Sequence, residues 1–494
     1  MIRWLWLVVS IAVPGVATAQ NVQAIDRYFT KALADWQAPG IAFAVVRNDS
    51  VVLMRGYGVR QLGKSDAVTP NTIFAVGSTT KAFTSATLGL LVDEGKINWD
   101  DRVTNYLPDF ELFDPYVTRE LTIRDLLTHR SGLVRGDRLW SNSGMSRAEV
   151  LRRVRFLEPT WSFRSQYGYQ NIMYLAAGTV VDKVTGTVWD DFVKQRIFEP
   201  LGMHRSFTSV VPLAAQTDVA SPHEKIGGVP TAVEWANIDN IGPAGSINSS
   251  VADMAQWIRL HLADGVYGGR RLIKAETIKE MHSPHMHTSR SATDERNFPE
   301  TNLTAYGLAW SLRDYRGMKL VSHGGAIRGM RAQVALVPGK KLGVVVLTNV
   351  SESSLPSAMM YWLLDRYTGG ADKDWSALYL ADAKAAQQRS EDERRKVEAA
   401  RVTGTSPSLA QAQYAGVYAD SMYGEISVTE ENGGLVARFG PHYTGDLQHW
   451  HFDTYAIVWR NPVFGPTRVT FQLDASGRVR SLVYPNLGTF GRKR

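Results

Sequence analysis

The chain has 494 residues, 44% of them hydrophobic, and its 55 Lys and Arg against 48 Asp and Glu give a formal net charge of +7. This apolar content excludes wholesale disorder, and the complete lack of cysteine excludes disulfides, thiolate metal sites and a cysteine nucleophile. The basic residues form no long stripe with interleaved aromatics, which argues against a nucleic-acid partner.

The N-terminus has the pattern of a secretory signal peptide over residues 1–19. Arg3 provides the positive charge, residues 5–13 form an apolar run, and Ala17-Thr18-Ala19 provides the small residues that a signal peptidase accepts. The run is shorter than the roughly 20 apolar residues that span a bilayer, which argues against stable membrane insertion. We therefore expect a secreted or periplasmic protein whose mature chain starts at Gln20.

The predicted elements then change from strand to helix and back to strand. After a helix over 21–36, a hairpin is expected whose strands, 41–46 and 51–55, flank Asn48-Asp49-Ser50. Further helices are expected at 78–94, 122–129, 146–156, 171–184, 188–197, 250–263 and 355–366, and late strands at 307–312, 319–322, 331–337 and 343–349. This order predicts an α+β fold: an antiparallel sheet assembled from both chain ends, flanked by helices, with a helical region inserted.

The composition changes after residue 370. Residues 371–406 include a run that is polar on every side of a helix, which predicts an exposed helical linker. From 407 to 494, short β-prone segments are separated by Gly, which predicts a small all-β domain. The segments are 414–418, 425–429, 435–439, 455–459, 469–473 and 479–484. The expected main domain is therefore 20–370.

Ser78-Thr79-Thr80-Lys81 is the first motif that can carry chemistry. At the start of a helix, Ser78 and Lys81 are one turn apart and share a face, so the amine can reach the serine hydroxyl. A serine needs such a base to become a nucleophile, and the N–H groups of a helix N-terminus can stabilise an oxyanion. The alternative is an ordinary helix N-cap with a solvated lysine.

Tyr169-Gln170-Asn171 is the second motif, directly before a predicted helix. Tyr169 and Asn171 can point into one cleft there, and a Tyr can shuttle a proton if nearby cations lower its pKa from about 10. The alternative is a buried Tyr beside an Asn that caps the helix.

His323-Gly324-Gly325 is the third motif, and it ends a strand-like run. Two glycines at a strand edge allow another backbone to approach closely. The N–H of Ala326 could then act as a second oxyanion donor, opposite the N–H of Ser78. A plain glycine turn between strands is the alternative.

In order and spacing, these motifs resemble the serine β-lactamase and penicillin-binding-protein superfamily, in its class C-like branch of D-peptidases and esterases. The resemblance covers about residues 24–370 and includes the segments 126–133, 200–203, 244–250 and 306–310. It implies that Ser78 is the acylated nucleophile, with Lys81 as its partner and Tyr169 as the general base and acid. It also implies that Asn171 contacts a substrate amide and that His323-Gly324-Gly325 corresponds to the K-T-G motif of the family. The β-domain resembles the lipocalin-like domain that follows this fold in some D-peptidase relatives.

The resemblance implies a secreted serine hydrolase that acts through an acyl-enzyme on amide bonds of small peptides with D- or unusual residues. Cell-wall fragments and linearised non-ribosomal peptides are the expected substrates, and a carboxylesterase that uses the same residues is the alternative. A β-lactamase or a non-catalytic penicillin-binding sensor is less favoured. One reason is that His323 stands where dedicated β-lactamases carry a Lys, and a neutral His is a poor anion partner. Which of Lys81 and Tyr169 takes the first proton stays open. The β-domain is expected either to cap the cleft or to mediate assembly of a homo-oligomer.

His282, His285 and His287 are spaced in a way that imitates a metal site. No carboxylate stands at a ligand spacing from them, and their Ser and Pro neighbours favour a solvated loop. No metal and no cofactor is therefore expected.

Overall fold

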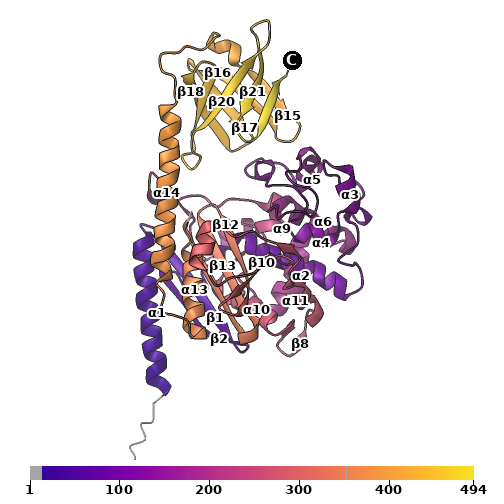
Figure 1. The fold of residues 1–494 in the computed structure, drawn as a ribbon, viewed down its shortest axis with the longest axis vertical. Helices are drawn as coiled ribbons and strands as arrows, with labels where there is room; N and C mark the ends of the chain where they lie inside the picture. The colour runs from indigo at the N-terminus through magenta and orange to yellow at the C-terminus, as the bar shows by residue number, and fades with distance from the viewer. Residues whose placement is uncertain (1–13, 352, 494) are drawn as a thin grey trace, which may run out of the picture.

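The computed structural model describes residues 14–351 and 353–493, so residues 1–13 of the predicted signal peptide lie outside the described part. Figure 1 shows an α/β body, a long helix along one side of it and a β-barrel above it. The body is built on one eight-stranded antiparallel sheet with the order β2-β1-β14-β13-β12-β11-β10-β9. The predicted sheet assembled from both ends of the main domain is thus confirmed. The strands are β1 (Gly40–Arg47), β2 (Ser50–Gly58), β9 (Met286–His287), β10 (Thr304–Tyr306), β11 (Ser311–Tyr315), β12 (Met318–Ile327), β13 (Met330–Val337) and β14 (Leu342–Thr348).

Helices cover both faces of this sheet. Because side chains alternate along a strand, Ala42 and Ala44 of β1 face one core and Phe43 and Val45 face the other. The first core contains the helices α2 (Thr80–Asp93) and α10 (Val251–Leu262), and the second contains α1 (Pro14–Trp36) and α13 (Leu355–Thr368). This double cover explains why β1 is an unbroken apolar run rather than an alternating one.

The inserted region between the early and late strands is mainly helical, as predicted. Besides α2 and α10, its α-helices are α3 (Pro115–Glu120), α4 (Ile123–Leu127), α5 (Arg147–Arg153), α6 (Asn171–Thr185), α7 (Trp189–Val193), α8 (Glu199–Leu201), α9 (Gly242–Gly245), α11 (Ala275–Met281) and α12 (Ala292–Asn297). Three two-stranded sheets accompany these helices. They pair β3 (Phe74–Ala75) with β6 (Asn248–Ser249), β4 (His223–Ile226) with β5 (Val229–Ala232), and β7 (Val266–Tyr267) with β8 (Arg270–Arg271).

One strand prediction was wrong in position, and another was correct but too short. Residues 307–310 of the expected strand 307–312 form a connection: β10 ends at Tyr306, Ala309 has a left-handed φ of 72°, and β11 starts at Ser311. The run 319–322 is the first half of β12, which continues through His323-Gly324-Gly325 to Ile327, so a glycine turn at this point is excluded.

The linker forms the long helix α14 (Trp375–Ala399), and its first turn belongs to the body. Trp375 is buried there, and its indole N–H donates to Asp365 Oδ2 at 2.7 Å. Tyr315 donates to the other oxygen of that carboxylate at 2.6 Å. The expectation of an exposed linker therefore fails at its start, where a buried aromatic side chain and a carboxylate fix the direction of the helix.

Beyond α14, eight antiparallel strands form a closed barrel, which confirms the all-β C-terminal domain. Sequence patterning missed two of its strands. The polar alternation of β18 and the glycines of β22 hid them, and Tyr418 of β15 pairs with Arg492 of β22 to close the barrel. The strands are β15 (Gly416–Asp420), β16 (Gly424–Glu431), β17 (Gly434–Phe439), β18 (Tyr443–His451), β19 (Thr454–Trp459), β20 (Thr467–Leu473), β21 (Val479–Tyr484) and β22 (Gly488–Arg492).

The barrel is docked on the body next to the segment 135–145. Met422, in the β15–β16 turn, is buried in the core of the body. Asn142 Nδ2 donates to the Tyr443 hydroxyl at 3.2 Å, and the Arg138 guanidinium lies 4.6 Å from the centre of the Tyr443 ring. No helix in the described part of the chain has both the length and the apolar character needed to cross a bilayer.

Candidate active site

Ser78 lies at the middle of a short 3₁₀ turn, η1 (Gly77–Thr79), that leads into α2. The helix thus starts two residues later than expected. Gly77 has a left-handed φ of +52°, and the turn lifts Ser78 to a half-buried position while its two neighbours stay buried. The serine therefore lies at the N-terminus of α2, where unpaired backbone N–H groups gather.

Lys81 is fully buried, one turn after Ser78, so the alternative of a solvated lysine is wrong. Its Nζ lies 3.1 Å from Ser78 Oγ, 2.7 Å from Asn171 Oδ1 and 2.7 Å from the carbonyl oxygen of Ala244. Burial lowers the pKa of Lys81 well below its ordinary value. The nearby charge of Asp137 opposes this shift and that of Arg135 adds to it.

These contacts define what Lys81 can do. Asn171 Oδ1 and Ala244 O can only accept hydrogen bonds, so each takes one N–H of the amine. In the neutral amine, which the lowered pKa favours, the lone pair is left for the third neighbour, the Ser78 hydroxyl. The arrangement can therefore accept the proton of Ser78.

Tyr169 lies directly before α6, as predicted, but Gln170 rather than Asn171 caps that helix. Burial raises the pKa of Tyr169 to about 12, although its hydrogen bond with Ser78 and the charge of Arg135 act to lower the pKa. The condition of a pKa lowered by cations is thus not met, because desolvation outweighs the effect of Arg135. A phenol with this pKa is a proton donor at neutral pH.

The Asn171 side chain is engaged at both ends. Its Oδ1 accepts from Lys81, and its Nδ2 donates to Asp137 Oδ1 at 2.9 Å. The amide therefore holds Lys81 in place, a role that the spacing of the motif gave no reason to expect.

His323 to Ala326 lie where β12 loses one of its partners. The pairing with β11 ends at Ser322, so the following residues pair with β13 alone and their other edge faces η1. A Cβ on Gly325 would lie 1.9 Å from the carbonyl oxygen of Val76, and one on Gly77 would lie 2.7 Å from the Ala326 nitrogen. The two glycines thus allow η1, which carries Ser78, to lie close to β12, with the Ala326 amide beside Gly77.

His323 is buried and neutral. Burial and the charge of Lys81 lower its pKa to about 3. Its Nδ1 lies 2.6 Å from the Gly324 carbonyl and must donate to it, so Nε2 accepts from the Tyr306 hydroxyl at 3.0 Å. The ring therefore has no charge and no free nitrogen to offer to a substrate carboxylate.

His129 packs against the aromatic side chains of the site, and no sequence motif predicted a functional role for it. Its ring is 4.2 Å from that of Tyr169 and 4.8 Å from that of Tyr306, centre to centre. Its Nδ1 accepts the Gln170 N–H at 3.0 Å, and its backbone has a left-handed φ of 56°. His129 thus fixes the residue that follows Tyr169.

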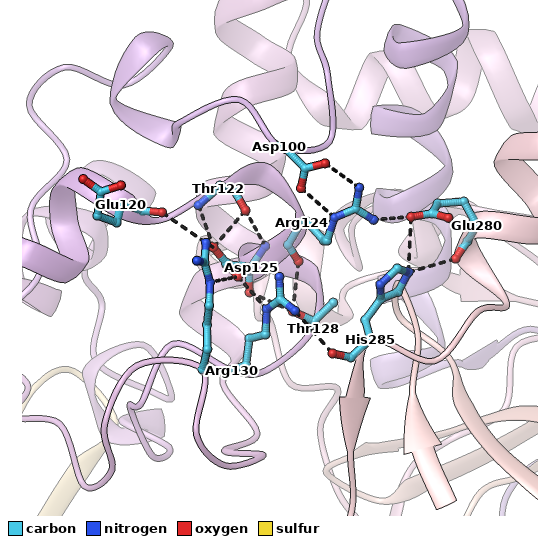
Figure 2. A network of polar contacts seen from close by, with 10 residues as sticks. Asp100, Glu120, Thr122, Arg124, Asp125, Thr128, Arg130, Glu280 and His285 are labelled. Atoms are coloured by element: carbon cyan, nitrogen blue, oxygen red, sulfur yellow. Dashed lines mark hydrogen bonds and ion pairs between the residues drawn. The ribbon is translucent and has the colours of Figure 1, made fainter.

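An ion-pair network around the buried Asp125 holds the loop that carries His129 (Figure 2). The fully buried Asp125 accepts from Arg130 Nε at 2.5 Å and from Arg164 Nη2 at 2.6 Å. Burial raises the pKa of this carboxyl, but the two guanidinium groups and the backbone of Thr122 leave the pKa below its ordinary value. Asp125 therefore ties α4 both to Arg130, the residue after His129, and to Arg164, in the segment that leads to Tyr169.

The three spaced histidines do not meet. His282 is buried, with Nε2 3.1 Å from His261 Nδ1, so a solvated loop is wrong for this residue. His285 is half-buried near Glu280, and His287 lies exposed in β9. Within residues 14–351 and 353–493, no group of three or more His, Asp or Glu side chains could hold a metal ion.

Ser78 at a helix N-terminus, with a buried lysine and a strand edge beside it, is an arrangement that suits a serine hydrolase. The Beta-lactamase family model matches residues 25–366, and the chain belongs to that family. A second model, described as a domain of unknown function, matches residues 400–491.

The chain is similar to two proteins named unguisins hydrolase. It is 32% identical to the one from Aspergillus campestris, over 70% of this chain and 65% of that protein. It is 30% identical to the one from Aspergillus violaceofuscus, over 82% of this chain and 76% of that protein. It is also 32% identical to penicillin-binding protein 4 of Amycolatopsis lactamdurans over 63% of this chain and 81% of that protein. The chain thus spans slightly less than two thirds of the first of these relatives.

Solved structures show the same fold over nearly the whole chain. An octameric penicillin-binding protein homologue from Pyrococcus abyssi has a TM-score of 0.63 at 22% identity, covering 95% of this chain and 99% of that one. The structure of SurE with D-Leu has a TM-score of 0.57 at 18% identity, with the same coverage.

Proposed function

We propose that this serine hydrolase cleaves amide bonds of small peptides with D- or unusual residues through an acyl-enzyme on Ser78. The observation that carries the proposal is the buried Lys81, whose two pure acceptor neighbours leave its lone pair for the Ser78 hydroxyl. Relatives named as hydrolases of unguisins, and a neighbour in fold solved with D-Leu, support this substrate class.

The proposed reaction has balanced proton transfers. Ser78 Oγ attacks the carbonyl carbon while Lys81 accepts the serine proton, and the N–H groups of Ser78 and Ala326 stabilise the oxyanion. Tyr169 then donates its phenolic proton to the departing amine nitrogen as the C–N bond breaks, and the proton held by Lys81 restores the phenol. In the second half, water attacks the acyl carbon, gives up a proton to the same pair, and Ser78 Oγ leaves with a proton.

A carboxylesterase is the second candidate. The neutral His323 leaves β12 without the cation that would bind a substrate carboxylate, which favours uncharged acyl groups and argues against a β-lactamase. Export through residues 1–19 and self-association through the barrel are further parts of the proposal. The octameric neighbour supports self-association as such.

A substrate panel tests the proposal. D- and L-aminoacyl p-nitroanilides, short-chain p-nitrophenyl esters and nitrocefin are compared on the wild type and Ser78→Ala. We expect turnover of the D-aminoacyl amides and a loss of at least about a thousandfold in Ser78→Ala. Ser85→Ala is the matched control, because this buried serine lies on the same helix and its hydroxyl has no partner in the described structure. Full turnover by Ser78→Ala would exclude the acyl-enzyme, and faster ester than amide cleavage would favour the esterase.

A further inference from the structure

Asp137 lies beside the site and has no part in the reaction proposed above. It begins the 3₁₀ turn η3 (Asp137–Leu139), whose Leu139 is fully buried. Its Oδ1 accepts from Asn171 Nδ2 at 2.9 Å and from the indole N–H of Trp140 at 3.1 Å. Its Oδ2 lies 3.3 Å from Arg135. The carboxylate is thus held on three sides.

We infer that Asp137 is a positioning residue that fixes the orientation of the Asn171 amide and thereby keeps the lone pair of Lys81 directed at Ser78. A carboxylate only accepts hydrogen bonds, so it selects the orientation in which the Asn171 NH₂ faces Asp137 and Oδ1 faces Lys81. In the flipped orientation, Nδ2 would donate into the lone pair and the base would be lost. This inference rests on the proposed role of Lys81.

The charge of Asp137 acts on Lys81 as well. The groups that face Lys81 are the rings of Tyr169 and Tyr174, 4.9 and 5.2 Å from Nζ, the neutral His129 and His323, and the charged Asp137 and Arg135. Asp137 is the only acid among them, and it raises the pKa of Lys81, whereas Arg135 lowers it. Removal of the carboxylate therefore lowers the pKa of Lys81 further, and the base stays deprotonated to a lower pH.

The test is the pH dependence of Ser78 labelling by a fluorophosphonate. Ser78 Oγ attacks phosphorus, fluoride leaves and Lys81 takes the serine proton, so the rate reports the base without knowledge of the natural substrate. Labelling is followed by intact mass between pH 4 and 9 for the wild type, Asp137→Asn and Asp137→Ala. Ser78→Ala provides the blank, and thermal melting verifies that each variant is folded.

We expect the acidic midpoint of the labelling rate to move to lower pH in both Asp137 variants. The plateau rate is expected to fall in the order wild type, Asp137→Asn, Asp137→Ala, with a loss of about tenfold in the last, because alanine leaves the Asn171 amide without an acceptor. Asp100→Asn is the charge-matched control: it removes a carboxylate that pairs with Arg124 and does not act on Lys81, and its profile should equal that of the wild type.

Two results separate the failures. If the wild type is not labelled at Ser78, the proposed function falls and this inference falls with it. If the wild type is labelled but the midpoint of the Asp137 variants stays constant or rises, Asp137 is merely structural and only this inference is overturned. A lower plateau without a shift of the midpoint counts against it in the same way.

Discussion

At the scale of single residues, burial decides the chemistry of this site. Lys81, Tyr169 and His323 all have pKa values moved toward their neutral forms, with desolvation as the first cause in each. A neutral amine beside a serine and a phenol that keeps its proton are the forms that the proposed reaction needs. Burial thus favours the protonation states that the proposed base, Lys81, and the proposed acid, Tyr169, need.

Burial of histidines also predicts acid sensitivity. The pKa values of His129, His261, His282 and His323 are lowered by burial, to about 3 at His261 and His323. Since histidine in the unfolded chain titrates near 6.5, the unfolded state binds more protons below that pH, and the free energy of unfolding falls as the pH drops from about 6.5 toward 3. At pH 5, His261 and His323 each lower the free energy of unfolding by about 2 kcal/mol.

Urea unfolding at pH 7.5 and 5.0 measures this effect. We expect a clear loss of stability at the lower pH and a smaller loss in His261→Gln. The exposed His287→Gln should behave as the wild type does. Equal stability at the two pH values would contradict the prediction.

At the scale of elements, strand β12 can lie close to the turn η1, which carries Ser78, because Gly325 has no side chain. Gly325→Ala would place a Cβ 1.9 Å from the Val76 carbonyl oxygen, so β12 and η1 must move apart. A displacement of about 1 Å at such a site costs roughly a hundredfold in rate, so we expect kcat to fall by this order with a folded protein.

Gly324→Ala is the matched control. Its Cβ would meet the mobile end of Gln333 at 3.0 Å and no backbone atom closer than 3.8 Å, so we expect a much smaller loss. Ester or amide turnover and the melting temperature are measured for both variants. If both retain wild-type rates, the close approach of β12 to η1 is not needed for activity.

At the scale of the whole molecule, the barrel and the body meet next to the turn that holds Asp137. The Met422 side chain of the barrel packs against Gly136, the residue directly before Asp137. A Cβ on Gly136 would be only 3.2 Å from its terminal methyl group. We expect Met422→Ala to weaken the docking by about 2 kcal/mol and to slow labelling of Ser78, because the turn at Gly136 loses its support. Limited proteolysis near residues 400–410 measures the weaker docking of the barrel, and labelling by a fluorophosphonate measures the effect on Ser78.

Val458→Ala, on the exposed outside of the barrel, is the control and should change neither measurement. A Met422→Ala protein with normal labelling and normal resistance to proteolysis would show that the barrel acts independently of the site.

The sequence by itself determined the sheet assembled from both ends of the main domain, the inserted helices, the all-β C-terminal domain and the family. These follow from local periodicity and from motifs whose residues are close in the chain. It also identified Ser78 and Lys81, because one helical turn joins them. The expected strand at 307–312 failed because a local apolar run does not show where a chain must turn.

Only the tertiary structure decided the chemical state of these residues and the partners that hold them. Asp137, His129 and the carbonyl of Ala244 reach the site from segments distant in sequence. The segments of His129 and Ala244 carry the family resemblance, but no pattern in them predicts these contacts, and no motif includes Asp137. Nor could the sequence predict that the pKa of Tyr169 rises rather than falls, since this depends on how far packing removes water from the ring. Desolvation and long-range hydrogen bonds are properties of the packed molecule, so the site is completed only when the sheet and the inserted helices come together.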